Sequence, residues 1–202
     1  MKTTSRCIPL GIFLMILLSC ATTSTDVKST WTAPDYSGTI TKVLIIGVSH
    51  SRTNQIIYEN YFADILKKHG VESVQSHTFF SSTVMPDKKA IAEAVKKSGA
   101  DTILLSQLID SKVVNIYVPQ EVNPAYDDLN YYYSHSWEYF STPGYNLTER
   151  EVVMQTNLFH AEDQKLFWTA TSDTTTMGTS SDIIKSFVKA IVKRMHKEGL
   201  IR

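Results

Sequence analysis

The chain has 202 residues, of which 43% are hydrophobic and 20% are charged. These proportions are typical of a globular protein and exclude a disordered or collagen-like chain. Its 20 basic residues balance 20 acidic ones, so no basic excess is available for binding nucleic acid. The two cysteines, Cys7 and Cys20, are too few for a zinc site built from cysteines and do not indicate a disulfide framework.

The first 20 residues have the pattern of a bacterial export signal. Lys2 and Arg6 make a positive start, and an apolar run of 11 residues follows from Ile8 to Leu18. This run is shorter than the roughly 20 residues that a helix needs to span about 30 Å of hydrocarbon. It ends in Leu17-Leu18-Ser19-Cys20, which resembles the lipobox of bacterial lipoproteins.

The lipobox resemblance implies that residues 1–19 are a lipoprotein signal peptide and that Cys20 is lipidated after cleavage. Two or three acyl chains, palmitate among them, would hold the protein stably on a membrane. Ala21 indicates the outer membrane, by the sorting rule of enteric-type bacteria, with the protein facing the periplasm. The alternatives are an ordinary cleaved signal with a chance cysteine, or an uncleaved anchor.

Residues 20–40 are expected to form a flexible tether. Residues 21–40 contain nine Ser or Thr and few large apolar groups, so they cannot bury enough surface to fold alone. Trp31 and Tyr36 are the exceptions, and both are expected to pack on the folded domain rather than bind a ligand.

Residues 41–202 are predicted to form a single α/β domain, beginning with alternating strands and helices. Strands are expected over residues 43–48 and 71–80 and from residue 103, and helices from about 54 to 69 and from 86 to 99. The strands start about 30 residues apart, which predicts parallel strands joined by right-handed crossovers. The first helix is expected to turn Ile57, Tyr61, Ile65 and Leu66 inward.

The pattern changes after the third strand. Residues 103–118 fit one long strand that bends near Asp110-Ser111, and residues 151–160 and 165–172 fit an antiparallel hairpin. A helix follows, capped by Ser180-Ser181-Asp182 and ended by Gly199. The predicted fold class is therefore α/β with a mixed, α+β-like sheet: three parallel βαβ-type strands followed by an antiparallel hairpin, with three helices.

Four segments carry a family resemblance. They are Trp31-Thr32-Ala33-Pro34-Asp35-Tyr36-Ser37-Gly38, Lys42-Val43-Leu44-Ile45-Ile46-Gly47-Val48, Ser98-Gly99-Ala100-Asp101 and Lys165-Leu166-Phe167-Trp168-Thr169-Ala170. In them the chain resembles small bacterial envelope lipoproteins whose α/β domain is like the N-terminal domain of TolB and the core of the curli secretion component. The resemblance implies an assembly accessory rather than an enzyme. The chain has no pore-forming extension of the curli type and no β-propeller, so neither of those functions is implied.

One candidate for chemistry lies where the first strand ends, at Ser49-His50-Ser51. His50 with Ser49 or Ser51 fits a base and nucleophile, or an anion pocket at a helix start. The interpretation we favour is a strand-to-helix turn with a Ser or Thr cap, because no nucleophile elbow or phosphate-binding glycine loop is present. The six histidines lack metal-ligand spacing, so no cofactor and no metal are expected.

Aromatic residues are concentrated in a predicted insertion at about residues 119–149. Residues 126–145 contain eight aromatics, and five of them are candidate partner-binding residues: Tyr131, Tyr132, Tyr133, Trp137 and Tyr139. Such side chains are enriched at binding hot spots. The alternatives are a long hairpin that buries half of these rings, or a mobile loop. Only Arg150 accompanies them, which disfavours nucleic acid.

Together these patterns predict a lipid-anchored bacterial envelope lipoprotein that is a non-enzymatic binding or assembly accessory. Its expected partners are the membrane, through Cys20, and another envelope protein or a cell-wall component. The alternative function is an envelope hydrolase-like enzyme that uses the Ser49, His50 and Ser51 loop. A third possibility is a domain that only oligomerises.

Overall fold

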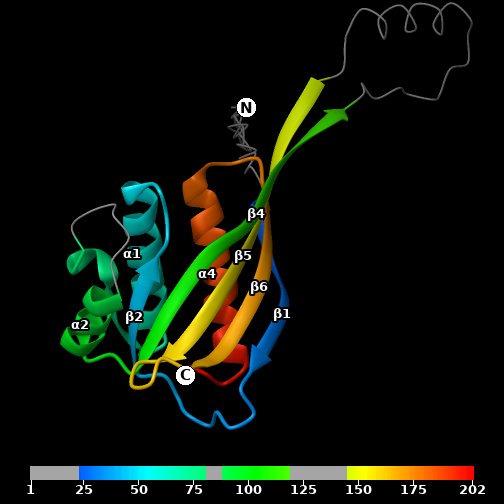
Figure 1. The fold of residues 1–202 in the computed structure, drawn as a ribbon. Helices are drawn as coiled ribbons and strands as arrows, with labels where there is room; N and C mark the ends of the chain where they lie inside the picture. The colour runs from blue at the N-terminus through cyan, green and yellow to red at the C-terminus, as the bar shows by residue number, and fades with distance from the viewer. Residues whose placement is uncertain (1–22, 81–87, 119–144) are drawn as a thin grey trace, which may run out of the picture.

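A computed structural model describes residues 23–80, 88–118 and 145–202 of the chain (Figure 1). One six-stranded sheet has the order β1-β6-β5-β4-β2-β3. Its strands are β1 (Ser24–Thr32), β2 (Lys42–Gly47), β3 (Glu72–Gln75), β4 (Thr102–Val118), β5 (Tyr145–His160) and β6 (Leu166–Thr176). The described helices are α1 (Arg52–Lys68), the 3-10 turn η1 (Ser76–Thr78), α2 (Lys88–Ser98) and α4 (Ser180–Lys197).

The parallel half of the sheet is as predicted. β2 pairs in parallel with β3 on one side and with β4 on the other. Its residues 43–45 are fully buried because helices cover both faces of the strand. The second predicted strand is wrong beyond Gln75, where the chain turns into η1. The chain turns there because the N–H of His77 donates to a buried carboxylate, that of Glu59, rather than to a neighbouring strand.

The antiparallel half contains the predicted hairpin of β5 and β6. β4 is the single long strand expected, and its register shifts between Leu108 and Asp110, which confirms the bend near Asp110-Ser111. β4 and β5 form a second hairpin that is paired out to Val118 and Tyr145. β5 thus begins at Tyr145, so the predicted insertion is wrong over residues 145–149. Residues 119–144 lie outside the described part of the chain.

The prediction of a flexible tether over residues 20–40 is wrong from Ser24 onward. Residues 24–32 form β1, which pairs antiparallel with β6. The reason is that β1 depends on backbone pairing and hydroxyl contacts rather than on apolar burial: the Thr25 hydroxyl is hydrogen-bonded with those of Thr174 and Ser186. The tether prediction considered only how much apolar surface the segment could bury, and it did not consider backbone pairing with another strand.

The two aromatics of this segment differ in their packing. Tyr36 packs as expected, stacked on Phe167 with ring centroids 4.2 Å apart, and burial raises the pKa of its phenol. Trp31 does not, since 47% of it is exposed. The expectation that both rings pack on the domain is therefore confirmed for Tyr36 and wrong for Trp31.

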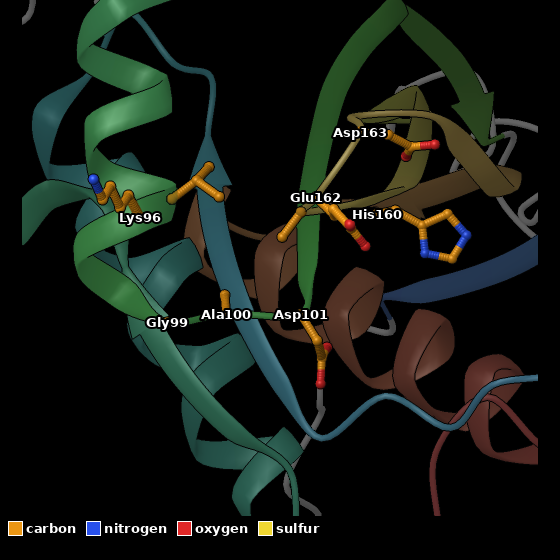
Figure 2. Close-up of a pocket in the computed structure, with 9 residues that line it drawn as sticks. Lys96, Gly99, Ala100, Asp101, His160, Glu162 and Asp163 are labelled. Carbon is orange, nitrogen blue, oxygen red and sulfur yellow. The ribbon is translucent and has the colours of Figure 1, made fainter.

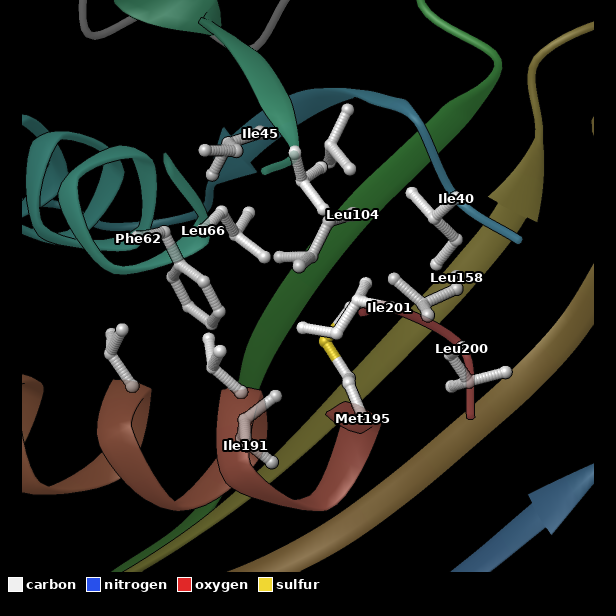
Figure 3. Packing of buried hydrophobic residues seen from close by; sticks show 14 of the residues in the cluster. Ile40, Ile45, Phe62, Leu66, Leu104, Leu158, Ile191, Met195, Leu200 and Ile201 are labelled. Carbon is white, nitrogen blue, oxygen red and sulfur yellow. The ribbon is translucent and has the colours of Figure 1, made fainter. Parts of the chain in front are cut away.

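The main core lies between the sheet and the helices α1 and α4 (Figure 3). Figure 3 shows side chains from β2, β4, β5 and both helices meeting around Met195, among them Ile45, Phe62, Leu66, Leu104, Leu158 and Ile191. A smaller core on the opposite face joins Ala94 and Val95 of α2 to β2 and β4. The two helix layers therefore enclose the parallel strands.

Helix α4 carries apolar side chains at helical spacing, and five of them, from Phe187 to Met195, are buried. Its N-cap is Thr179, one residue before the predicted cap. The hydroxyl and N–H of Thr179 both donate to the Asp182 carboxylate, which lowers the pKa of that group. This reciprocal capping box satisfies helix donors that would otherwise be unpaired.

A chain that begins at Ala33 instead of Ala21 will test the assignment of β1. We expect its free energy of unfolding to fall by about 2 kcal/mol or more, because β6 loses its antiparallel partner and Thr174 and Ser186 lose their hydrogen bonds with Thr25. Urea unfolding followed by tryptophan fluorescence measures this. An unchanged midpoint would show that residues 24–32 behave as a tether.

Candidate functional site

The carboxyl end of β2, beside Ser106 within β4, forms the topological switch point of the sheet. Helix α1 connects β2 to β3 on one face, and α2 connects β3 to β4 on the other. Gly47, the last residue of β2, lies opposite Ser106 of β4. In open α/β sheets, ligands bind outside the strands at such a point. This is the place where a ligand or a catalytic group is expected.

A buried carboxylate, that of Glu59 in α1, lies at the carboxyl end of β2, on the side of η1, which follows β3. Glu59 is 0% exposed. Its Oε1 accepts hydrogen bonds from the N–H of Gly47 (3.0 Å), from Nε2 of Gln55 (3.0 Å) and from the hydroxyl of Ser76 (2.6 Å). Its Oε2 accepts from the backbone N–H of His77 (2.8 Å) and lies 2.7 Å from Nδ1 of the same residue.

These contacts join the end of β2, helix α1 and η1 through one side chain. An ionised carboxylate taken out of water costs several kcal/mol unless hydrogen bonds or a partner charge replace the lost hydration. Here five polar contacts do so, and Arg52 supports them by donating to the carbonyl of His77 (3.0 Å) and to Gln55 (3.0 Å). The Glu59 cluster, comprising Gly47, Gln55, Glu59, Ser76 and His77, is therefore a closed structural junction.

A second polar contact lies beside the Glu59 cluster. The hydroxyl of Tyr58 donates to that of Ser106 (2.7 Å), which is hydrogen-bonded with Thr156 of β5 (2.9 Å). Burial raises the pKa of the Tyr58 phenol. A Cβ on Gly47 would come within 2.9 Å of the Tyr58 ring, so only glycine fits where β2 passes under α1.

The segment Ser49-His50-Ser51 is a strand-to-helix turn capped by a serine, which is the interpretation favoured from the sequence. The hydroxyl of Ser51 accepts from the N–H of Asn54 (3.3 Å) and caps α1, and the hydroxyl of Ser49 accepts from the N–H of Ser51 (3.1 Å). His50 is exposed, and no hydrogen bond within residues 23–80, 88–118 and 145–202 joins it to either serine. The loop therefore satisfies backbone donors and does not assemble a base with a nucleophile.

The sequence reasoning missed Glu59 and His77. It placed Ile57, Tyr61, Ile65 and Leu66 on the inner stripe of α1. Leu66 is buried, and Tyr61 and Ile65 are partly buried against the main core, whereas Ile57 belongs to neither group. The buried residues are Tyr58, Glu59, Phe62, Ala63 and Leu66, at helical spacing from one another. Glu59 precedes Phe62 by three residues and Ala63 by four, and residues at this spacing share one face of a helix. This spacing is the signal that could have placed Glu59 on the buried face.

A separate open hollow of about 670 Å³ lies at the other end of the sheet, between the end of α2 and the β5–β6 turn (Figure 2). In Figure 2, Lys96 and His160 lie on opposite sides, and Asp101 points away from both. The Asp101 carboxylate accepts from the backbone N–H groups of Thr41 and Lys42. The charged groups of this hollow diverge, so it is not a convergent ligand site.

Three further observations concern metal ligands, membrane-spanning helices and the remaining predicted site residues. In the part of the chain that the structure covers, no three His, Cys, Asp or Glu side chains are grouped as metal ligands would be. None of the helices described has the length and apolar character needed to cross a bilayer. Cys20 and the five candidate aromatics (Tyr131, Tyr132, Tyr133, Trp137 and Tyr139) lie outside the described residues.

No family model and no curated protein matches the chain. Similar solved structures include PelC from Paraburkholderia phytofirmans, crystallised as a dodecamer, at 14% identity over 83% of this chain and 94% of PelC, with a TM-score of 0.45. The lipoprotein GNA1162 from Neisseria meningitidis matches at 13% identity over 78% of this chain and 99% of its own, with a TM-score of 0.43.

A PDZ domain protein from Parabacteroides distasonis matches at 9% identity over 87% of this chain and 37% of its own, with a TM-score of 0.39. A lipoprotein thus stands among the structural neighbours of this α/β domain. TM-scores below 0.5 carry no argument about function, and the finer likeness to TolB and the curli component stays a prediction.

The substitution Glu59→Gln will test the Glu59 cluster. An amide cannot accept at its nitrogen, so at least one buried donor loses its partner, and we expect the free energy of unfolding to fall by about 2–4 kcal/mol. Urea unfolding at neutral pH measures this loss.

Glu72→Gln is the matched control. The Glu72 side chain is 77% exposed and its oxygen lies 3.6 Å from Lys42, so we expect a change within about 0.5 kcal/mol. Equal effects of the two substitutions would contradict a special role for the buried carboxylate.

Proposed function

We propose that this protein is a lipid-anchored envelope lipoprotein that binds another envelope component without catalysing a reaction. The observation that carries the proposal is the β4–β5 arm, defined as residues 107–118 of β4 and the paired residues 145–155 of β5. Figure 1 shows the far end of this hairpin projecting beyond the ends of the other strands, since β6 pairs with β5 only from Arg150 onward.

Apolar side chains are exposed along the β4 side of the arm. Four of them are more than half exposed: Leu108 (57%), Ile109 (53%), Val113 (59%) and Tyr117 (60%). Val114 and Ile116 between them are exposed to a lesser degree. Val113 and Tyr117 share one face of the strand, and Val114 and Ile116 share the other. Exposed apolar side chains gathered on one element mark a binding site. The arm is therefore the surface we assign to a partner.

The backbone of β4 adds a second binding feature. β2 pairs with β4 only as far as Ser106, and among the strands of the described ranges none continues that pairing along residues 107–118. An open strand edge accepts an added strand from a partner. The bulge near Ile109 and the ion pair between Lys112 and Glu151 (2.7 Å) disfavour indiscriminate edge pairing. This combination suits a selective partner.

The aromatic segment extends the same surface in our proposal. Residues 119–144 connect β4 to β5 at the end of the arm, where Val118 pairs with Tyr145. We assign partner contacts to Tyr131, Tyr132, Tyr133, Trp137 and Tyr139 because Tyr and Trp contribute strongly at binding hot spots. The partner class is another envelope protein or a cell-wall component. Nucleic acid is disfavoured because Arg150 alone accompanies the aromatics, which is too little positive charge for a nucleic-acid groove.

The anchor in this proposal is Cys20, acylated after cleavage of residues 1–19, with the domain facing the periplasm from the outer membrane. The lipobox Leu17-Leu18-Ser19-Cys20 and the short apolar run before it support this assignment. The capping roles of Ser49 and Ser51 support a binding function over the hydrolase alternative, because both hydroxyls already serve the start of α1.

The double substitution Val113→Lys with Tyr117→Lys will test the arm. Two charges on one face of β4 should weaken partner capture about tenfold or more while leaving the fold intact, because both side chains are already solvent-exposed. Crosslinking in the native envelope, followed by mass spectrometry, measures the recovered partners. Met177→Lys, at an apolar position 46% exposed outside the arm, is the control. Equal recovery of partners by the unsubstituted protein, the double variant and the Met177→Lys control would show that the arm does not bind the partner.

The substitution Cys20→Ser will test the anchor. We expect it to abolish incorporation of radiolabelled palmitate and to release the protein from the membrane fraction, since the acyl chains have no other attachment point in the mature chain. Cys7→Ser, which lies within the signal segment, should leave both unchanged. Membrane retention with labelling in the Cys20→Ser protein would contradict lipidation at this residue.

A further inference from the structure

We propose that a stripe of three lysines on α4 binds the anionic phosphate headgroups of the bilayer to which the protein is attached. The lysine stripe consists of Lys185, Lys189 and Lys193. The proposal deepens the function proposed above and rests on the anchor at Cys20. It adds a defined membrane-facing surface to a protein otherwise held only by its acyl chains.

The first argument is the distance available to the chain. Thr23 is the first described residue and β1 begins at Ser24, which is built into the sheet. Three residues of fully extended chain span at most about 11 Å, so Thr23 stays within that distance of an acylated Cys20. Since the acyl chains of Cys20 enter the hydrocarbon, the amino end of β1 lies at the headgroup level or directly above it.

The second argument is what lies beside the amino end of β1. Residues 23–25 and α4 line an open groove of about 550 Å³, in which the three lysines are exposed. The Thr25 hydroxyl donates to that of Ser186 (2.9 Å), which fixes β1 against the helix. The lysines recur every four residues, about 6 Å apart along the axis, so they form one row. The lipid attachment therefore brings this row close to the membrane.

The third argument is charge. Asp182 is the one acidic residue among those lining the groove, and its carboxylate already accepts from the hydroxyl and N–H of Thr179. The groove therefore keeps a net positive charge of about two. The mature chain as a whole is slightly acidic, with 18 basic against 20 acidic residues once Lys2 and Arg6 are removed. The positive potential is local to this surface, which matches an anionic bilayer.

The experiment measures vesicle binding by the mature chain, residues 20–202, carrying Cys20→Ser so that no acyl chain contributes. The probes are vesicles of phosphatidylcholine alone and vesicles with a large fraction of phosphatidylglycerol, and the readout is cosedimentation. We expect binding only to the anionic vesicles. We also expect this binding to be lost when the salt concentration is raised, because salt screens the electrostatic attraction.

The substitutions Lys185→Gln, Lys189→Gln and Lys193→Gln together should weaken this binding about 100-fold, by the usual contribution of a lysine at an anionic surface. The matched control, Lys67→Gln with Lys68→Gln and Lys96→Gln, removes the same charge from exposed positions on α1 and α2. It should change binding by less than threefold. Circular dichroism checks that each protein is folded.

The proposal is overturned if the mature chain does not bind anionic vesicles, or if the two triple variants bind equally. Should the triple variant fail to fold, the single substitution Lys189→Gln replaces it, with an expected loss of about fivefold. Because the vesicle assay uses no lipidated protein, its failure is distinct from failure of the anchor, which palmitate labelling reports separately.

Discussion

Backbone pairing along β4 is the constraint on which the rest of the structure depends. Over residues 102–106 this strand pairs with both β2 and β5, so it joins the parallel half of the sheet to the antiparallel half. Past Ser106 it keeps β5 alone as a partner among the described strands. One strand thus builds the two-layered core in its first part and the projecting arm in its second. The bulge at Ile109 marks the change from one environment to the other.

The carboxyl end of β2, beside Ser106 of β4, is already occupied by side chains of α1. In many α/β proteins this position is open to a ligand. Here the carboxylate of Glu59 lies against the N–H of Gly47 and the imidazole of His77, so the groups that would meet a ligand are already paired. Among the described residues, two surfaces differ in character: the arm carries exposed apolar side chains, and the outer side of α4 is basic. We assign them to a protein or wall partner and to the bilayer, respectively.

The inclusion of residues 24–32 in the sheet changes the picture of how the domain is held. A long tether would let the domain sample a wide volume around its anchor. A strand that begins at Ser24 leaves only a few residues between an acylated Cys20 and the folded domain. In our proposal, the domain is therefore oriented as well as attached. An oriented domain presents the arm in a restricted direction, which lowers the orientational cost of binding a partner in the same envelope.

The sequence by itself determined the local elements whose signals are local. The β-branched run over residues 43–48, the apolar stripe of α4 and the bend in β4 each follow from spacing and side-chain type, and the parallel connections follow from chain length and handedness. The predicted export signal and lipobox also rest on patterns of adjacent residues. Tertiary structure alone decided the features that depend on partners distant in the chain. β1 is a strand because the edge of β6 is available to it, and Glu59 is buried because Gly47, Ser76 and His77 converge on it. The strand partner of β1 and the hydrogen-bond donors to Glu59 come from distant parts of the chain. Neither can therefore be predicted from the residues next to β1 or Glu59 in the sequence.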